Sequence, residues 1–251
     1  MTFTGNIQKG GAMLDDTRRF LEAWDTSLDS AANIRRIADG NLLGKTSRKR
    51  SDDVLLRILV PRFVDPGPDV VPALRALRDE PRAFREACFY ETARDDGLLA
   101  ACAQGPIWTW YSEGRIGVAV DDVKIWLKDQ TDRGNLKELT DTVRTKVARG
   151  LLAALRDFGI LRGTIRKEFN SPGMSAKGFA YVAFRETQQG AGARALVDSP
   201  IWHRWLLDDR WVADLLAKAD RIGVLRHSQV GSAVRIDWNA ATLQEVVDAA
   251  A

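Results

Sequence analysis

The chain has 251 residues, of which 45% are hydrophobic and 28% are charged, and its formal net charge is +3. This length allows one large domain or two ordinary ones, and the composition excludes a disordered chain. No apolar run reaches the roughly 18 residues needed to cross a bilayer, and no secretory signal opens the chain. Cys88 and Cys102 lie in helical-looking sequence and are typical of buried thiols in a reducing compartment. The sequence therefore predicts a cytoplasmic protein with no membrane span.

The positive charge is concentrated in two segments. Residues 134–186 contain ten Lys or Arg and five Asp or Glu, whereas residues 41–62 contain six and two. Their net charges are +5 and +4, so the remaining residues carry −6. Separated positive charge favours contact with a polyanion, although a basic helix can also be merely solvated. The first segment is the stronger candidate because its charge coincides with a helix-turn-helix pattern.

Residues 1–115 predict a helical bundle. Apolar residues recur at helical spacing from Leu14 to Leu59, and helices resume after the prolines of residues 66–72. Within this bundle, four cations precede a helix that Ser51 or Asp52 can cap. A nucleic-acid contact and a solvated loop are equally good interpretations of this basic cluster, which consists of Lys45, Arg48, Lys49 and Arg50. A further helical run is predicted over residues 83–103, and Gly105–Pro106 closes it.

Residues 116–190 predict a winged helix-turn-helix. A short helix begins at Asp121, a break follows at residues 132–135, and a longer helix runs from Leu136 or Thr140 to Phe158. Two alternating segments then predict the strands of a wing, residues 163–169 and 178–185, joined by the link 170–177. This order of elements is that of a fold that lays one helix in the DNA major groove and a wing beside it.

The longer helix has two faces. At 100° per residue, one side carries apolar residues that would pack on the core, namely Val143, Val147, Leu151, Leu155 and Phe158. The opposite side carries hydroxyls and cations, which bond phosphate oxygens and guanine edges. We therefore expect DNA contacts from Thr142, Thr145, Lys146, Arg149 and Arg156. Taken alone, this pattern fits an ordinary amphipathic helix with a solvated basic face as well as it fits a DNA-binding helix.

The predicted wing adds four cations to this surface. They are Arg162, Arg166, Lys167 and Lys177, and the glycine-containing basic link between the strands suits approach to a phosphate backbone. Lys167 and Lys177 are expected near the turn. The same hairpin would also complete the core through its apolar side chains, and the two roles are compatible.

Residues 191–251 predict a small helix–hairpin unit. A helix begins at Pro200, another covers residues 211–219, and two alternating segments around Gly231 predict a hairpin of residues 222–227 and 233–238. A last helix is expected over residues 241–249.

The sequence contains no pattern typical of a catalytic or cofactor site. Residues 40–46 resemble a phosphate-binding loop, but three residues separate the glycines instead of four, and the preceding segment reads as helix. His203 and His227 have no Cys or His at ligand spacing, and no nucleophile elbow is present. We therefore predict no catalytic residue, no cofactor and no metal. Trp108 and Trp110 could stack on bases, but packing is the commoner role of such residues.

Several short motifs spread over most of the chain carry a family resemblance. They are Lys9–Leu14 (KGGAML), Thr17–Arg18, Trp24, Asn41–Leu43 with Ser47 and Arg50, Arg62, Phe158–Leu161 (FGIL), Trp211 and Gly223–Leu225 (GVL). With these motifs the chain resembles the BrxA family, accessory proteins of the BREX bacteriophage-exclusion systems. Its members have often been labelled inner-membrane proteins, which the hydropathy here contradicts. The resemblance implies a small helical DNA-binding protein without a recognised catalytic site, acting beside a modification methyltransferase and other defence proteins.

Together these observations predict a mainly α protein that binds double-stranded DNA and is not an enzyme. The basic helix and wing would contact mainly phosphates, with Lys146, Arg149, Arg166 and Lys167 as leading contacts. Two alternatives stay open: a protein-interaction adaptor, favoured by an exposed surface around Trp108, Trp110 or Trp202, and an RNA-binding helical protein.

Overall fold

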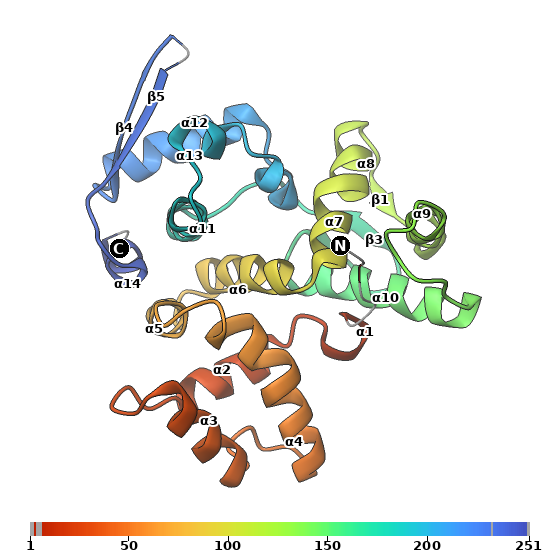
Figure 1. Cartoon of the computed structure of the whole chain (residues 1–251). Helices are drawn as coiled ribbons and strands as arrows, with labels where there is room; N and C mark the ends of the chain where they lie inside the picture. The colour runs from red at the N-terminus through yellow and green to blue at the C-terminus, as the bar shows by residue number, and fades with distance from the viewer. Residues whose placement is uncertain (1–2, 4–6, 232, 250–251) are drawn as a thin grey trace.

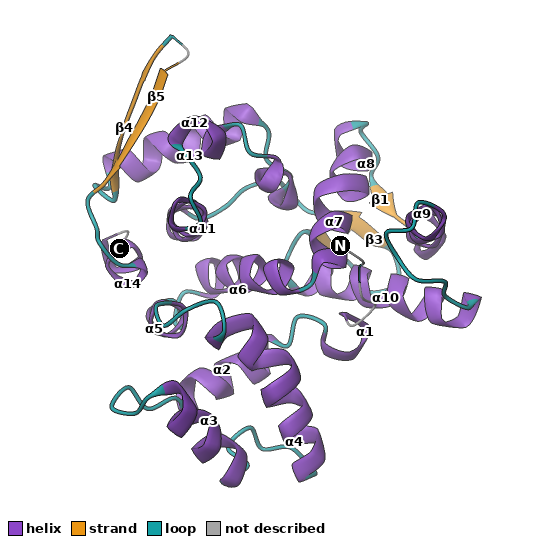
Figure 2. Cartoon of the chain, viewed as in Figure 1, coloured by secondary structure: helices purple, strands orange, loops and turns teal. Residues whose placement is uncertain are grey.

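A computed structural model describes residues 3, 7–231 and 233–249 (Figure 1). The described chain is mainly helical, as predicted, with two small antiparallel sheets (Figure 2). Its buried apolar side chains form one continuous core cluster that draws on all three predicted segments of the chain.

The N-terminal half is a set of helices arranged beside the long helix α6 (Figure 1). Side-chain caps set two of their starts, since Asp29 accepts the Ala32 amide at 2.7 Å and Ser47 accepts the Arg50 amide at 3.2 Å. The elements are α1 (Ile7–Gly10), α2 (Leu14–Ala23), α3 (Ser30–Asp39), α4 (Arg48–Val54), the π-helical segment η1 (Leu55–Val64), α5 (Val70–Ala76), α6 (Pro81–Asp95), α7 (Gly97–Cys102), the π-helical segment η2 (Ala103–Ile107) and α8 (Trp108–Ser112).

The helical run predicted over residues 83–103 is present, but one expectation about its end was wrong. The run is divided at Asp96, whose carboxylate accepts the Leu99 amide at 3.0 Å and starts α7. Gly105–Pro106 does not end the helical run, because it lies inside η2 and α8 follows directly. Proline lacks an amide and crowds the preceding turn of a helix, and a widened π turn is one way to accommodate it.

The central segment contains two helices and a three-stranded sheet. The elements are β1 (Gly117–Val118), α9 (Val120–Asp132), α10 (Asp141–Asp157), β2 (Leu161–Arg162) and β3 (Lys167–Phe169). The strand order is β1-β3-β2, and Glu168 lies opposite both Gly117 and Arg162. Gly159 follows Phe158, the C-cap of α10, and adopts φ +83°, the left-handed conformation with which glycine commonly terminates a helix. The predicted helix, break and longer helix are therefore present at the predicted residues.

The prediction of a second strand over residues 178–185 is wrong. These residues lie inside the helix α11 (Ala176–Gln188), which begins where Ser175 Oγ accepts the Gly178 amide at 3.0 Å. Every residue from 178 to 185 is buried. A helix that is buried on all sides shows no amphipathic stripe, so its short apolar run cannot be distinguished from a strand by periodicity. The hairpin instead consists of β2, which precedes the first predicted strand, and β3, which is the end of that predicted strand.

The C-terminal elements pack back onto the N-terminal helices. They are α12 (Ala193–Val197), the 3-10 helix η3 (Pro200–Trp205), α13 (Asp209–Arg221), β4 (Leu225–Val230), β5 (Ala233–Trp238) and α14 (Leu243–Ala249). The hairpin β4–β5 confirms the predicted hairpin with its first strand displaced by three residues, and it projects away from the other elements (Figure 1). Helix α14 contacts both α5 and α11, so packing crosses the predicted segment boundaries.

Helix α6 joins the three segments through aromatic and polar contacts. Phe89 is fully buried and stacks on Phe158 after α10, with ring centroids 4.9 Å apart, and meets the edge of Trp205 in η3 at 5.3 Å. Each such pair contributes roughly 0.5–1.5 kcal/mol beyond the area that it buries.

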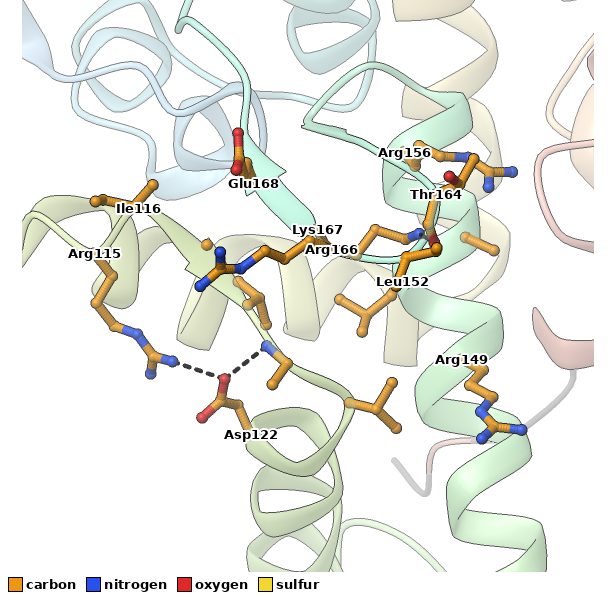
Figure 3. Close-up of a pocket in the computed structure, with 16 residues that line it drawn as sticks. Arg115, Ile116, Asp122, Arg149, Leu152, Arg156, Thr164, Arg166, Lys167 and Glu168 are labelled. Carbon is orange, nitrogen blue, oxygen red and sulfur yellow. Dashed lines mark hydrogen bonds and ion pairs between the residues drawn. The ribbon is translucent and has the colours of Figure 1, made fainter.

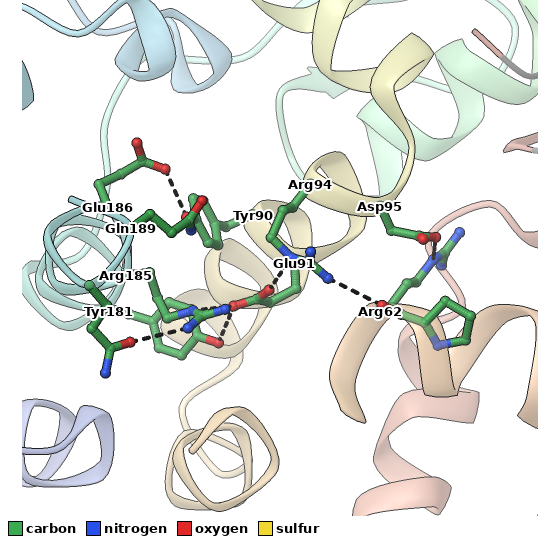
Figure 4. Close-up of polar contacts among 11 residues, drawn as sticks. Arg62, Tyr90, Glu91, Arg94, Asp95, Tyr181, Arg185, Glu186 and Gln189 are labelled. Carbon is green, nitrogen blue, oxygen red and sulfur yellow. Dashed lines mark hydrogen bonds and ion pairs between the residues drawn. The ribbon is translucent and has the colours of Figure 1, made fainter. Parts of the chain in front are cut away.

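A buried polar network ties α6 to α11 and η1 (Figure 4). The fully buried carboxylate of Glu91 accepts hydrogen bonds from Tyr181 Oη at 2.9 Å, Arg185 Nε at 2.9 Å and Arg94 Nε at 3.0 Å. Arg94 also donates to the Pro61 carbonyl in η1 at 3.2 Å. A buried charge is costly unless it is paired and hydrogen-bonded, and Glu91 meets both conditions.

A second buried carboxylate fixes the start of α11. Glu86 is 5% exposed, accepts the Ser175 amide and hydroxyl, and pairs with Arg82 Nε at 3.1 Å. Gly178 lies against it so closely that a Cβ there would be 2.9 Å from Glu86 Cβ and would overlap Glu86 Oε2. This position therefore requires glycine.

Burial raises the pKa of the Glu86 carboxyl above its ordinary value of 4.5, more than the bonds from Ser175 and Arg82 lower it. The folded protein therefore takes up a proton at Glu86 at a higher pH than the unfolded chain, so this group adds stability as pH falls. As the pH is lowered from 7 to 4.5, we expect the free energy of unfolding of the parent to increase relative to that of Glu86→Gln. Urea denaturation of both proteins measures the difference, and identical pH profiles would contradict the assignment.

Candidate nucleic-acid interface

An open groove of about 930 Å³ lies between β1, α10 and the β2–β3 hairpin (Figure 3). Leu152 and Ala153 of α10 line it together with residues 115–120 and 164–168. Five cations and two carboxylates line it: Arg115, Arg149, Arg156, Arg166, Lys167, Asp122 and Glu168. The groove therefore carries a formal charge of +3 and is suited to an anionic ligand.

Helix α10 presents a polar stripe that leads into this groove. Thr142, Lys146 and Arg149 are exposed and follow one another at spacings of four and three residues, so they share one face. Arg149 and Arg156 then line the groove on the same stripe. The opposite face is buried at Val147, Leu151 and Leu155, whereas Val143 is half-buried. The predicted division of this helix into an apolar and a polar face is confirmed.

Three exposed cations among the contacts predicted on α10 and the hairpin form no ion pair within the described part of the chain. They are Lys146, Arg149 and Arg166, and each is exposed. Arg149 projects from α10 and Arg166 from the hairpin (Figure 3). A cation without a carboxylate partner releases only bound water when it binds a phosphate. These three side chains can therefore bind an anion without breaking an ion pair within the protein.

Other predicted contacts around the groove are engaged within the protein. Arg156 pairs with Asp157 at 2.6 Å, Arg162 pairs with Glu168 at 3.2 Å, and Thr145 Oγ1 donates to the Asp141 carbonyl at 2.9 Å. Exposed pairs of this kind are weak, so an incoming phosphate could compete for the two arginines.

Lys167 has a local structural role. Its ammonium donates to the Gly163 carbonyl at 2.9 Å and to the Thr164 carbonyl, so it bridges the turn of the hairpin. Desolvation by the surrounding hairpin lowers the pKa of Lys167, and the nearby Arg156 guanidinium lowers it further. Lys167 lines the groove, but its charge is already directed at the hairpin backbone.

Lys177 does not belong to the wing. It lies on α11 and its half-buried ammonium pairs with Glu80 at the start of α6. Its expected position near the turn depended on the strand predicted over residues 178–185, which is a helix. The structure therefore separates Lys177 from the groove, because it is not among the residues that line it.

The second predicted cluster lies at the start of α4. Lys45 pairs with Asp16, and Arg48 pairs with Asp39 at 3.1 Å. Lys49 and Arg50 are exposed and form no ion pair with a described residue. Of the four cations in the cluster, only Lys49 and Arg50 are therefore not paired with a carboxylate of a described residue.

Sequence reasoning missed Arg115 and Ile116 as groove residues, and it expected the apolar side chains of the hairpin, Ile165 among them, to lie in the core. Arg115 stacks over the Trp110 ring at 5.0 Å and donates to Asp122 Oδ2 at 2.7 Å, and that oxygen also accepts the Ala119 amide (Figure 3). Ile116 and Ile165 line the groove although they are 80% and 101% exposed. Arg115 lies outside the basic segment 134–186, and β1 is too short to give a strand pattern, so the sequence carries no signal for it.

The three tryptophans that would favour an adaptor if exposed are buried or half-buried. Trp202 is buried and stacks on Phe179 at 4.7 Å. Trp108 is half-buried and stacks on His203 at 4.2 Å, while Trp110 lies under Arg115.

No helix among residues 7–231 and 233–249 is long and apolar enough to span a membrane.

Comparisons with known proteins place this architecture in a family. A structural match is the crystal structure of an uncharacterized protein from Magnetospirillum magneticum, at a TM-score of 0.62 and 16% identity, covering 82% of this chain and 98% of that one. At this identity the match shows a shared fold. No curated protein matches the sequence. The BrxA family model matches residues 1–186, and the chain therefore belongs to the BrxA family, which implies a BREX-associated defence protein.

Proposed function

We propose that this protein binds double-stranded DNA through the α10 stripe and the β2–β3 hairpin, mainly at phosphates and without catalysis. The order β1, α9, α10, β2, β3 with the sheet order β1-β3-β2 fits a winged helix-turn-helix, in which α10 would enter the major groove. The observation that carries the proposal is the exposure of Lys146, Arg149 and Arg166 without carboxylate partners among the described residues. Arg149 and Arg166 line the groove, and Lys146 lies on the α10 stripe that leads to it.

The chemistry of this surface favours phosphate contact over base reading. Arginine and lysine bind phosphate oxygens on any sequence, whereas specificity needs side chains that reach base edges. Thr142 and Lys146, in the first turns of α10, are the side chains best placed to reach a base edge. We therefore expect strong dependence on salt and modest sequence preference from the charged contacts.

Equilibrium titration tests this proposal against its alternatives. The full-length protein is titrated by fluorescence anisotropy with a random duplex at several salt concentrations, and a matched RNA serves as the control. Saturable duplex binding with a steep negative salt slope supports the proposal. Preference for the RNA would favour an RNA-binding protein, and absence of binding to either at low salt would favour a protein-interaction adaptor within the defence system.

A further inference from the structure

Ile165 is an apolar side chain held at the tip of a basic hairpin. It is fully exposed, lines the groove and makes no contribution to the core cluster. Single exposed apolar residues are common on protein surfaces, so exposure alone would carry no argument. Two features distinguish Ile165 from such residues: the hydrogen bonds of the turn that carries it and the cations beside it.

The tip that carries Ile165 is braced by internal bonds. The Lys167 ammonium bridges the carbonyls of Gly163 and Thr164, and Arg162 pairs with Glu168 across the two strands at 3.2 Å. Gly163 adopts φ +85°, and a Cβ there would overlap the Arg166 carbonyl oxygen. The turn is therefore tight, and Ile165 within it is fully exposed.

Cations flank this apolar tip. Arg166 follows it directly, and Arg149 lies on the α10 side of the same groove, both without carboxylate partners among the described residues (Figure 3). The minor groove of duplex DNA presents the matching arrangement, with phosphates along both edges and stacked bases between them. Proteins that insert an apolar side chain between base steps combine cations on the edges with such a wedge in the centre.

We propose that Ile165 enters the minor groove as an apolar wedge, partly unstacks one base step and bends the duplex. This inference rests on the proposed function, since the hairpin reaches DNA only if α10 and its groove bind it. Pyrimidine–purine steps unstack most easily, so sites with a central TA or CA step should be bound more tightly than sites without one. Such a preference would arise without a hydrogen bond to any base.

The bend can be measured by energy transfer between dyes at the two ends of a short duplex with a central TA step. The full-length parent protein should shorten the end-to-end distance at saturation. Ile165→Ala should keep duplex binding within a few-fold of the parent and lose the shortening, whereas Ile165→Leu, which retains a wedge, should keep it. Ile125→Ala removes an isoleucine that is 71% exposed on α9 but does not line the groove, and it should bend DNA like the parent.

Anisotropy recorded on the same samples separates the two possible failures. If the parent saturates the duplex without shortening it, or if Ile165→Ala shortens it as much as the parent does, the wedge is wrong and the proposed DNA binding stands. If the parent does not bind the duplex at low salt, the proposed function fails and the wedge fails with it. Equal affinity for duplexes with and without a flexible central step would also contradict the wedge.

Discussion

Replacing Lys146 and Arg149 with alanine should weaken duplex binding on every sequence and flatten its dependence on salt. Each of these side chains is exposed, lies on the polar stripe of α10 and forms no ion pair with a described residue. If each neutralises one phosphate, the slope of log affinity against log salt should become less negative by about 0.9 per residue, or roughly 1.8 in all. Alanine favours helix, so the double variant should fold normally.

The matched control is the double variant of Lys49 and Arg50. It also removes one lysine and one arginine, both exposed and without an ion-pair partner among the described residues, but from α4 instead of α10. Its salt slope should stay close to that of the parent. An equal loss in both variants would indicate that only net charge matters, and a larger loss in the control would move the interface to α4.

Gly178→Ala should lower the free energy of unfolding by about 3 kcal/mol, the upper end of typical costs for overfilling a packed core. The new Cβ would approach Glu86 Cβ to 2.9 Å and displace a buried carboxylate that holds the start of α11 through Ser175. Neither α6 nor α11 can move freely, because the Glu91 network and the aromatic contacts of α6 bind them to other elements. Denaturant unfolding followed by circular dichroism measures the loss.

Gly192→Ala provides the comparison for this substitution. Gly192 has φ −71°, and a Cβ there would meet no atom within 4 Å, so the change should stay within about 0.5 kcal/mol. Equal stability of the Gly178 and Gly192 variants would show that the contact between α6 and α11 is looser than described.

The sequence predicted α9, the break and α10 well because local signals define them. Thr140 caps α10, Gly159 ends it, and its apolar residues keep helical spacing. The core face and the stripe of Thr142, Lys146 and Arg149 follow from that spacing alone. Lys146 and Arg149 could therefore be placed on one exposed face of α10 without knowledge of the fold.

The errors arose where tertiary packing decides the structure. Residues 178–185 form a helix because α6 and the C-terminal elements surround them, and no local residue signals that burial on all sides. Lys177 was assigned to the wing through this error. The roles of Lys167 and Lys177 also depend on partners that spacing cannot identify, namely the carbonyls of the hairpin turn and Glu80.

Photo-cross-linking from single cysteines tests most directly whether DNA occupies the groove. Cys88 and Cys102 are fully buried, and burial raises the pKa of both thiols, so a photoactivatable maleimide should label only an introduced cysteine. Thr142→Cys on α10 and Thr164→Cys at the hairpin should cross-link to a random duplex, whereas Ala213→Cys, exposed on α13, should not. Cross-links from residue 213 equal to those from residues 142 and 164 would contradict the assignment of the groove as the DNA interface.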